Sequence, residues 1–543
     1  MQNFSIPQAS RRGFLTALGA IGAASALAAS LSACGGDSGG TSTQTSAGTP
    51  AGGGTANETG TITAAISYQL GTNGYDPLTT TAALTQAVNW HTLEGLTELH
   101  PATRKCYAAL GAELPKKIDD ETYEVTLRDG AVFTDGNPVT AADVVFSFER
   151  VMNPDNKSLF SSFITFIDSV TAKDETTVTI KLKYPFSLVA ERLAVVKIVP
   201  QAAVEADPKA FDLYPVGSGP YKMTDNSASS QVVVFERNDA YNGPMPARAA
   251  KMEWQVIPDD STRTNALTSS TVQAIDSVPA ANLATLAQTK TVAAQQGFGL
   301  LFAMFNCGAA PMDNVKNRQA IMYALDYEKI TKTGMSDLAT PATSFVQKEH
   351  PAYNPAAVQY PEGGVAKAKE LLAETGLTTV RLLASNHGWF SAVRPMIKES
   401  LEAAGLTVQY DEKASSDVYS TIDGNVDAFD IVIAPGDPSV FGDDADLLLR
   451  WWYAGDTWTN SRMHWKGQDS YNQVQDLLEK AQQATGQAQK DLWHQTFDVI
   501  SENVPLYPIF HRKTPTAYDG ETLVDFKPIA VTGLSFVGVG STK

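Results

Sequence analysis

The sequence predicts an α/β protein that folds into more than one lobe. The first half of the chain alternates apolar and polar residues over short runs such as Thr122–Arg128 and Thr177–Lys183, which is the pattern of half-buried strands. The second half carries apolar residues at three- and four-residue spacing, as in Tyr471–Ala484 and Gln487–Glu502, which is typical of amphipathic helices. The 483 residues of Thr61–Lys543 exceed the size of one ordinary core, so two or three lobes are expected.

Further strands are predicted in the first half. Thr61–Ser67 and Gln231–Arg237 are short β-rich runs bounded by turn residues. Between them, Thr140 is the expected N-cap of a helix over Ala141–Arg150, because its hydroxyl can accept a hydrogen bond from a free backbone N–H of the first turn.

The second half contains the clearest helix boundaries. Asp313 is the expected cap of a helix that runs to about Lys332. Helices over Val365–Thr375 and Ala392–Ala404 are each followed by a glycine that can adopt a left-handed C-cap, Gly376 in the first case. A strand over Thr407–Tyr410 follows the second helix.

The N-terminal segment has the features of an export signal. Arg11 and Arg12 precede an apolar, Ala-rich run that ends in Leu31-Ser32-Ala33-Cys34. The paired arginines resemble a twin-arginine signal, and the last four residues resemble a lipobox, in which Cys34 is acylated and becomes the new N-terminus. A transmembrane helix over Phe14–Ala33 is the alternative, because its 20 residues could span a bilayer. The small-residue junction with cysteine favours a signal peptide over residues 1–33.

The segment that follows predicts a tether. Residues 34–60 consist largely of Gly, Ser, Thr and Ala, a composition that cannot bury a core and forms a flexible coil. Such a coil spans roughly 25–30 Å. We therefore expect an extracytoplasmic protein, anchored to the cell membrane by lipid on Cys34, whose folded body stands away from the bilayer.

Charge and cysteine content restrict the possible functions. Without the two arginines of the signal, 39 Lys and Arg oppose 59 Asp and Glu, a formal charge of −20. Such an acidic chain is not expected to bind nucleic acid, because nothing neutralises the phosphates. After the signal, no apolar run approaches the 18 residues that a transmembrane helix needs, so no further membrane span is expected. Cys106 and Cys307 could form a disulfide or remain separate thiols.

A series of motifs runs along nearly the whole mature chain. These are Tyr75-Asp76-Pro77, Leu93-Glu94-Gly95-Leu96, Thr122–Arg150, Pro215–Tyr221, Glu236–Tyr241, Met304-Phe305-Asn306, Arg318–Asp326, Lys367–Gly376 and Trp493–Phe510. In this order and spacing they resemble the family 5 extracellular solute-binding proteins, receptors of ABC importers for peptides, nickel chelates, opines and some oligosaccharides.

The resemblance implies a hinged two-lobe fold of the periplasmic-binding-protein type II kind, with an extra subdomain in lobe I. On this chain it places lobe I at 61–300 including the subdomain at about 83–213, lobe II at 301–503, and a return to lobe I at 504–543. The two segments that cross between the lobes and form the hinge are expected near Gly299–Asn306 and Val504–His511.

The same resemblance implies the function. A small solute, with an oligopeptide as the first expectation, binds between the lobes, and closure of the hinge presents it to an ABC permease in the membrane. The protein is expected to be a monomer without cofactor, metal or catalytic activity.

Candidate ligand-binding residues follow from the family's pocket. They are Tyr68 and Gln69 after the first strand, Phe305 and Asn306 after the hinge, Trp389, and, within residues 434–453, Asp437, Trp451, Trp452 and Tyr453. Aromatic side chains supply stacking area without a fixed polar partner. The alternative that several of these aromatics pack in the core stays open.

One departure concerns the peptide termini. Peptide-binding members place an acidic residue, which pairs with the α-ammonium group, two or three positions before an Asp-Pro or Glu-Pro step. Here Asp437-Pro438 follows Ala434-Pro435-Gly436, so that carboxylate is missing, and Asp437, Asp443 or Asp444 would have to replace it. No Arg is expected near Ser385–Trp389 for a C-terminal carboxylate.

The alternatives are other ligands or an enzyme. An oligosaccharide fits an aromatic pocket with few fixed charges, and a nickel chelate or haem could be liganded by His387 or His464. An exported hydrolase is the remote alternative. Lys332-Thr333-Gly334 matches one box of serine acyltransferases, but no Ser-x-x-Lys, Gly-x-Ser-x-Gly or His-Glu-x-x-His accompanies it.

Overall fold

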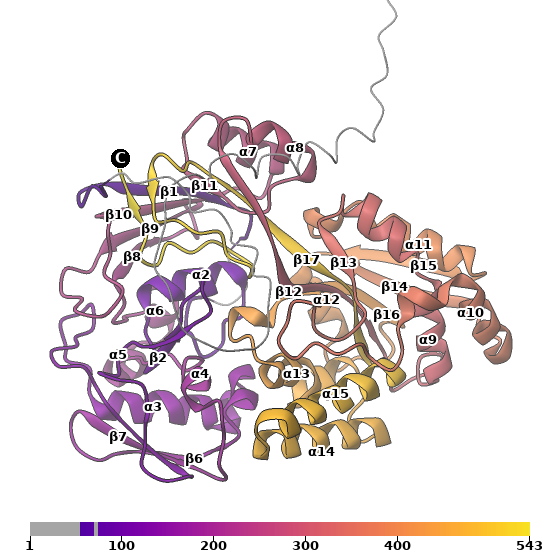
Figure 1. The fold of residues 1–543 in the computed structure, drawn as a ribbon, viewed down its shortest axis with the longest axis horizontal. Helices are drawn as coiled ribbons and strands as arrows, with labels where there is room; N and C mark the ends of the chain where they lie inside the picture. The colour runs from indigo at the N-terminus through magenta and orange to yellow at the C-terminus, as the bar shows by residue number, and fades with distance from the viewer. Residues whose placement is uncertain (1–54, 70–73) are drawn as a thin grey trace, which may run out of the picture. The chain divides into compact units, whose positions relative to one another are not determined.

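The structure, a computed structural model, describes residues 55–69 and 74–543, which fall within one compact unit (Figure 1). The predicted signal at 1–33, the acylation site Cys34 and the linker as far as residue 54 lie outside the described residues. The prediction that the flexible linker extends to residue 60 is wrong at its end, because Asn57 N donates to Ser541 O at 2.7 Å and Gly60 O accepts from Ala250 N at 2.9 Å. In the described part of the chain, no helix combines the length and apolar character needed to cross a bilayer.

One mixed sheet of 11 strands runs through the fold, in the order β15-β14-β16-β12-β17-β11-β1-β10-β9-β8, with β13 paired to β17. Strand β1 pairs in parallel with β10, and β14 in parallel with β15 and β16. The strands are β1 (Thr61–Ile66), β8 (Tyr221–Asn226), β9 (Val232–Arg237), β10 (Lys251–Val256), β11 (Ala274–Ile275), β12 (Thr291–Phe305), β13 (Ala339–Pro341), β14 (Thr379–Ser385), β15 (Thr407–Lys413), β16 (Ile431–Gly436) and β17 (Leu506–Tyr518).

The antiparallel pair β12 and β17 connects the two ends of this sheet. Leu300 lies opposite His511, and Met304 opposite Leu506. Every residue of β12 from Gly297 onward is buried, because other elements cover both faces, and such strands carry continuous apolar runs instead of alternation. Both predicted hinge segments fall at this pair. In Figure 1 it runs between the strands β1 and β8–β11 and the strands β14–β16.

Smaller sheets and helices complete the first half. A four-stranded sheet has the order β4-β5-β7-β6, and β2 pairs with β3. These elements are β2 (Thr97–Leu99), β3 (Cys106–Ala108), β4 (Lys116–Lys117), β5 (Thr122–Thr126), β6 (Ile167–Ala172), β7 (Thr177–Leu182), α2 (Ala83–Thr92), α3 (Ala141–Met152), α4 (Val189–Leu193), α5 (Gln201–Ala206), α6 (Pro208–Leu213), α7 (Asp260–Thr268) and α8 (Ala280–Leu286). The strands predicted at Thr122–Arg128 and Thr177–Lys183 are thus confirmed as β5 and β7.

The predicted cap of α3 is also confirmed. The Thr140 hydroxyl accepts a hydrogen bond from Asp143 N, and an Asp143 carboxylate oxygen accepts one from Thr140 N at 3.0 Å. The two residues therefore satisfy each other's backbone donors, as in a capping box. The side chains of Val144 and Phe148, which lie on this helix, are fully buried.

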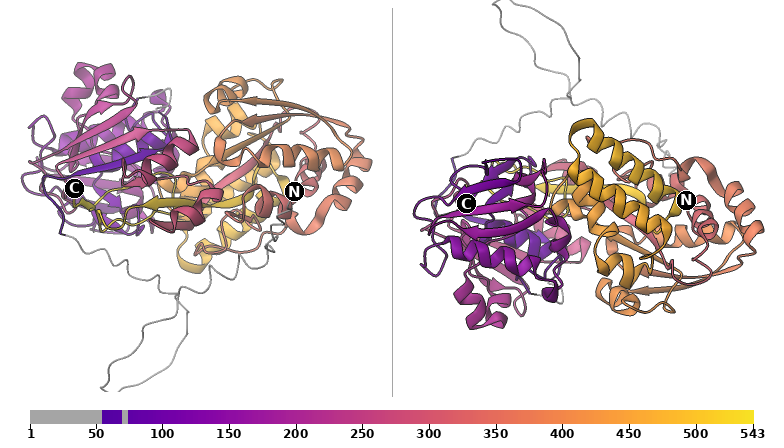
Figure 2. Two further views of the ribbon diagram at one scale, coloured as in Figure 1. Left: turned by 90° about the horizontal axis from the view of Figure 1, so that it is seen from above. Right: turned by 90° about the horizontal axis from the view of Figure 1, so that it is seen from below.

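The second half is richer in helices, as predicted. They are α9 (Val315–Ala324), α10 (Tyr360–Thr375), α11 (Val393–Ala403), α12 (Ser415–Ile422), α13 (Ala445–Tyr453), α14 (Asp469–Gln483) and α15 (Gly486–Asn503). Helix α10 ends at Gly376, whose φ of 72° is left-handed. The contacting helices α14 and α15 are drawn in amber in Figure 2. Two short strands, β18 (Leu523–Val524) and β19 (Gly540–Ser541), pair near the C-terminus.

The prediction for the helix after residue 313 is wrong at both ends. Asn314, not Asp313, is the N-cap, and its side chain accepts a hydrogen bond from Lys316 N at 3.0 Å. The helix ends at Ala324 because Leu325 is extended, and Lys329–Gly334 forms a separate π-helical segment. Apolar spacing continues through both pieces, so it could not reveal the break.

The predicted lobe boundaries fall at the central strand pair. Residue 300 lies inside β12, and residue 503 is the last residue of α15, just before β17. The predicted subdomain at about 83–213 begins with α2 and ends with α6. We propose that the lobes and the subdomain of this chain have these boundaries. Cys106 and Cys307 are free thiols.

His91 in α2 is a neutral histidine in the core of predicted lobe I. Its Nε2 accepts a hydrogen bond from Phe536 N at 2.9 Å, so Nδ1 carries the proton and donates to Ala87 O at 2.7 Å. The ring packs edge-on against Trp254, with centroids 5.1 Å apart. Burial lowers the pKa of His91 to about 4, because the charged form would be desolvated.

We expect His91 to make the fold acid-sensitive between pH 6.5 and about 4. In that window the unfolded chain binds a proton that the folded chain excludes, so stability falls with pH, by about 3 kcal/mol for this residue over the full window. His91→Gln does not titrate. The free energy of unfolding, measured with urea, should therefore change less steeply with pH in the variant than in the wild type. The difference in slope should correspond to about one proton. Equal slopes would contradict the assignment.

Candidate functional site

Three of the predicted ligand-binding residues come together around Arg512 in β17. Trp389 lies in a short 3-10 helix, Gly388–Phe390, and its ring centroid is 4.5 Å from the Arg512 guanidinium carbon. Tyr68 follows β1, with its hydroxyl 3.4 Å from Ser277 Oγ. Burial and the Asp276 carboxylate raise the pKa of Tyr68, while the charge of Arg512 and a hydrogen bond with it act in the opposite direction.

Asp437, the third of these residues, is held by hydroxyl and amide donors. Its Oδ2 accepts hydrogen bonds from Thr532 N and Thr532 Oγ1, both at 2.7 Å, and its Oδ1 accepts one from Ser439 Oγ. Thr532 Oγ1 in turn accepts a hydrogen bond from Arg512 Nη2 at 2.8 Å. On the other side, Arg104 Nη2 donates to Ser439 O. Asp437 thus interacts with both arginines through intervening groups.

Gly299 in β12 makes room for these two charged groups. A Cβ atom at this position would lie 3.3 Å from Asp437 Oδ2 and 3.4 Å from Arg512 Nε. Both charged groups therefore face the backbone of the hinge strand at this glycine. The site is built from both predicted lobes and the strands that join them.

The structure corrects the expectation that no arginine lies near Ser385–Trp389. Arg512 stacks on Trp389, although more than 100 residues separate them in sequence, and Arg394 donates to His387 O at 2.8 Å. Arg512 stands one residue beyond the predicted hinge segment, at the end of a buried apolar run. A charged residue at the end of a buried strand could have identified Arg512 as a candidate functional residue. Arg104 and Thr532 lie outside the named helices and strands, and no sequence pattern indicated them.

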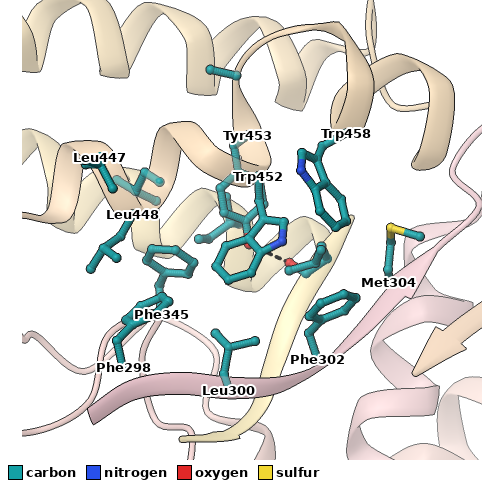
Figure 3. Packing of buried hydrophobic residues seen from close by; sticks show 14 of the residues in the cluster. Phe298, Leu300, Phe302, Met304, Phe345, Leu447, Leu448, Trp452, Tyr453 and Trp458 are labelled. Atoms are coloured by element: carbon teal, nitrogen blue, oxygen red, sulfur yellow. Dashed lines mark hydrogen bonds between the residues drawn. The ribbon is translucent and has the colours of Figure 1, made fainter. Parts of the chain in front are cut away.

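Four predicted site residues are packed inside the protein. Phe305, Asn306, Trp452 and Tyr453 are at most 1% exposed. Asn306 Nδ2 donates to two backbone carbonyls, and Tyr453 Oη donates to Leu506 O at 2.7 Å. In Figure 3, Trp452 and Tyr453 lie within the apolar cluster that includes Phe298, Leu300, Phe302, Phe345, Leu447, Leu448 and Trp458. In this conformation they offer no surface to a solute, and their role is packing.

The two remaining candidates lie elsewhere. Trp451 is partly buried, and its ring stacks on that of Phe163 with centroids 6.0 Å apart and lies 5.1 Å from that of Phe441. Trp451 therefore contributes to the contact between the predicted subdomain and lobe II. Gln69 is exposed.

A buried ion pair crosses the same contact. Arg192 of α4 is fully buried, and its Nη2 lies 2.5 Å from Asp444 Oδ1 and 3.1 Å from Asp446 Oδ2, at the start of α13. Arg450 Nε donates to both oxygens of Asp446 at 3.0 Å. The predicted subdomain and lobe II are thus joined by charge as well as by aromatic packing.

A small cavity lies between these surfaces. A cavity of about 30 Å³ is lined on one side by α2 and residues near β2, and on the other by Val440 and Phe441. This volume holds one or two water molecules and no peptide. A wider hollow of about 720 Å³ lies over the turns of the four-stranded sheet, with an acid-rich lining that includes Asp119, Asp120, Glu121 and Asp168. It lacks the aromatic lining of a solute pocket.

In the described part of the chain, His387 and His464, which were considered as ligands of a nickel chelate or haem, do not belong to a cluster of metal-binding side chains. His387 lies beside Arg512 and Arg394, whose charges, together with burial as the larger cause, lower its pKa to about 4. Those positive charges disfavour a bound cation. Across residues 55–69 and 74–543, no group of three or more His, Cys, Asp and Glu side chains could hold a metal ion.

Arg192→Met tests the buried ion pair. The substitution removes a basic partner from Asp446, which is fully buried, and from Asp444, which is 16% exposed. We therefore expect the free energy of unfolding to fall by about 3–5 kcal/mol, measured by urea denaturation. The matched control is Lys332→Met, which removes a 2.7 Å pair with Glu328 whose side chains are 63% and 75% exposed. The control should match the wild type, and a loss of similar size in both variants would contradict the role of burial.

Comparison with known proteins identifies the family and the relatives that this chain resembles. The family profile of bacterial extracellular solute-binding proteins, family 5 Middle, matches residues 107–472. The glutathione-binding protein GsiB of Escherichia coli (strain K12) is 27% identical over 472 residues, which cover 85% of this chain and 91% of GsiB.

Two solved structures share the fold. The periplasmic binding protein DppA from Helicobacter pylori, in complex with the peptide STSA, has a TM-score of 0.78 at 20% identity and covers 89% of this chain and 98% of its own. AgaA from A.tumefacien R10, in complex with agropinic acid, has a TM-score of 0.78 at 24% identity, with coverages of 89% and 99%. The predicted two-lobe α/β fold is confirmed. Because the profile match covers more than half of its length, this chain belongs to the family 5 bacterial extracellular solute-binding proteins.

Proposed function

We propose that this protein is the lipid-anchored receptor of an ABC importer, which captures an oligopeptide between its two lobes and delivers it to a membrane permease. Membership of the family makes it a binding protein and not an enzyme. The observation that carries the proposal is the meeting of Tyr68, Trp389 and Asp437 around Arg512, since it brings aromatic and charged groups of both predicted lobes to the hinge strand.

The arrangement supports a closing mechanism. A solute that contacts Tyr68 from lobe I and Trp389 from lobe II gains both sets of interactions only when the lobes are together. Such a solute shifts the population toward the closed state. The ion pair of Arg192 and the aromatic contact of Trp451 favour the same state.

A peptide fits this site chemically. Aromatic faces at Tyr68 and Trp389 can pack on side chains or on the peptide plane, while charged groups can orient the termini. Two relatives point the same way, since GsiB is named for glutathione, a tripeptide, and DppA is a peptide complex. An oligosaccharide would use the aromatic faces, and its hydroxyls could hydrogen-bond with the charged groups, but it would supply no charge to pair with them.

The lipid anchor and linker complete the proposed mechanism. Acyl chains on Cys34 hold the receptor at the membrane, and a coil that follows Cys34 and ends before residue 55 lets the body reach a permease in the same bilayer. Confinement to the membrane surface raises the effective concentration of receptor at the permease without a new contact.

Peptide binding should be visible in intrinsic fluorescence and in thermal stability. We expect at least one member of a panel of di- to hexapeptides that includes glutathione to change tryptophan emission saturably. A hundredfold excess over Kd should stabilise the fold by about 2.7 kcal/mol. Trp389→Leu should weaken the emission change, while Trp254→Phe, in the core of lobe I, should retain it. A flat response to all peptides would refute the proposal, and a response to oligosaccharides alone would support the other ligand class.

Acylation is tested in growing cells. Metabolic labelling with a palmitate analogue should mark the wild-type protein, which should sediment with membranes. Cys34→Ser should lose the label and leave the membrane fraction, whereas the matched control Cys106→Ser should behave like the wild type. A labelled or membrane-bound Cys34→Ser protein would exclude Cys34 as the anchor.

A further inference from the structure

A six-residue loop of lobe II, residues 437–442, reaches into the contact with lobe I, and we call it the plug loop. It contains the short 3-10 helix Pro438–Val440 and follows directly on β16, whose last residue, Gly436, pairs with β12. After the loop, the carbonyl oxygen of Asp443 accepts a hydrogen bond from His350 Nε2 at 2.7 Å. Both ends of the plug loop are therefore attached to lobe II.

Between its ends, the plug loop is held by groups of lobe I. Asp437 Oδ2 accepts hydrogen bonds from the amide and the hydroxyl of Thr532, both at 2.7 Å. The carbonyl oxygen of Ser439 accepts one from Arg104 Nη2. Thr532 belongs to the C-terminal segment and Arg104 to the subdomain, so these bonds form only while the lobes are together.

Phe441 supplies the apolar part of the plug loop. Its ring centroid lies 5.1 Å from that of Phe160 and 6.1 Å from that of Phe163, which both belong to the 3-10 helix Leu159–Phe163 of the subdomain. On the side of lobe II, it lies 5.1 Å from the ring of Trp451. Phe441 is only 9% exposed, so its ring is wedged between the subdomain and α13.

The space beside Phe441 has a polar wall on the opposite side. The cavity of about 30 Å³ is bordered by Val440 and Phe441 of the plug loop and by Asn89 and Glu98 of lobe I. Asn89 is buried and its Nδ2 donates to Tyr75 O at 3.3 Å, whereas its Oδ1 has no hydrogen-bond partner among the described residues. A buried carbonyl oxygen without a donor is costly. This wall therefore suits a solute that brings an N–H or O–H group.

We propose that the plug loop is an autoinhibitory element. Phe441 occupies part of the space between the lobes in the empty receptor, and a solute binds only after displacing it. The inference rests on the proposed function and adds to it a step that precedes binding. A receptor with the plug in place is not competent to bind, so the apparent affinity is lowered by the fraction of molecules in which the plug is open. The contacts of Phe441 with Phe160 and Phe163 set that fraction.

The rate of binding tests the plug. The probes are glutathione and trialanine, followed by stopped-flow tryptophan emission. In the wild type, the observed rate should level off at high peptide concentration, because opening of the plug becomes limiting. Phe441→Ala should raise the association rate constant about three- to tenfold, the factor that corresponds to the loss of an aromatic pair. Phe441→Leu keeps an apolar side chain and should lie between the two, which also provides a test if the alanine variant does not fold. An equal or lower rate in both variants would overturn the proposal.

A matched control separates the plug from a general loosening of the subdomain. Phe146→Ala removes a half-buried ring of α3 that packs on the Arg150 guanidinium, 5.6 Å from its centroid, and on a small apolar cluster of the subdomain. This ring does not contact lobe II in the described structure, so the variant should bind at the wild-type rate. A comparable increase in the control would overturn the specific role of Phe441.

Fluorine NMR follows the ring without removing it. A single 4-fluorophenylalanine at position 441 should change its chemical shift when saturating peptide is added, because the ring leaves Phe160, Phe163 and Trp451. The same label at position 148, which is fully buried in α3, should keep its shift. An unchanged resonance at position 441 in the peptide-bound protein would show that the ring is not displaced, and would refute the plug.

The outcomes distinguish the two levels of inference. If a peptide binds but neither the association rate of Phe441→Ala nor the resonance at position 441 changes, the plug is refuted while the peptide receptor stands. Binding by Phe441→Ala alone would support both, since the plug would then block the wild type. If neither protein binds any peptide saturably, the proposed function falls and the plug falls with it.

Discussion

The antiparallel pairing of β12 with β17 is the constraint on which the rest of the structure depends. In the described part of the chain, these two strands form the long pair that connects the two ends of the large sheet. Leu300 lies opposite His511 in this pair. Their buried apolar run packs between covering elements. Since both strands pass from one predicted lobe to the other, any relative movement of the lobes must bend them or the segments at their ends.

This constraint also decides where the charged groups lie. Arg512 follows directly after the apolar part of β17, and Gly299 opens the facing part of β12. The hinge therefore positions the guanidinium itself, while the loops of the lobes supply Trp389, Thr532 and Asp437 around it. A residue on a strand is held more accurately than one on a loop.

Much of the fold could be predicted from sequence because its signals are local. The capping box at Thr140 and the left-handed Gly376 act within one turn of a helix, so residues a few positions apart suffice to identify them. The break after Ala324 was missed because apolar spacing continues across it. The choice between Asp313 and Asn314 as cap depends on one residue of register, which periodicity does not resolve.

The candidate site was only partly predictable, because it is made by distant residues. Trp452 and Trp389 look alike as tryptophans in lobe II, yet one lies among Phe298, Phe302 and Phe345 and the other under Arg512. Nothing near either residue in sequence encodes that difference. The family resemblance suggested a region, but the stacking of Arg512 on Trp389 could be seen only in the structure.

The dry ion pair at Arg192 has a consequence for life outside the cytoplasm. Dissolved ions screen charges that face water and hardly affect those that do not. Neither Arg192 nor Asp446 is exposed, so a change of ionic strength in the surrounding medium leaves their attraction almost intact. A rise in ionic strength weakens the mutual repulsion of the many acidic side chains on the surface, and a fall strengthens it. Brackish and dilute surroundings therefore leave the contact between α4 and α13 comparably firm.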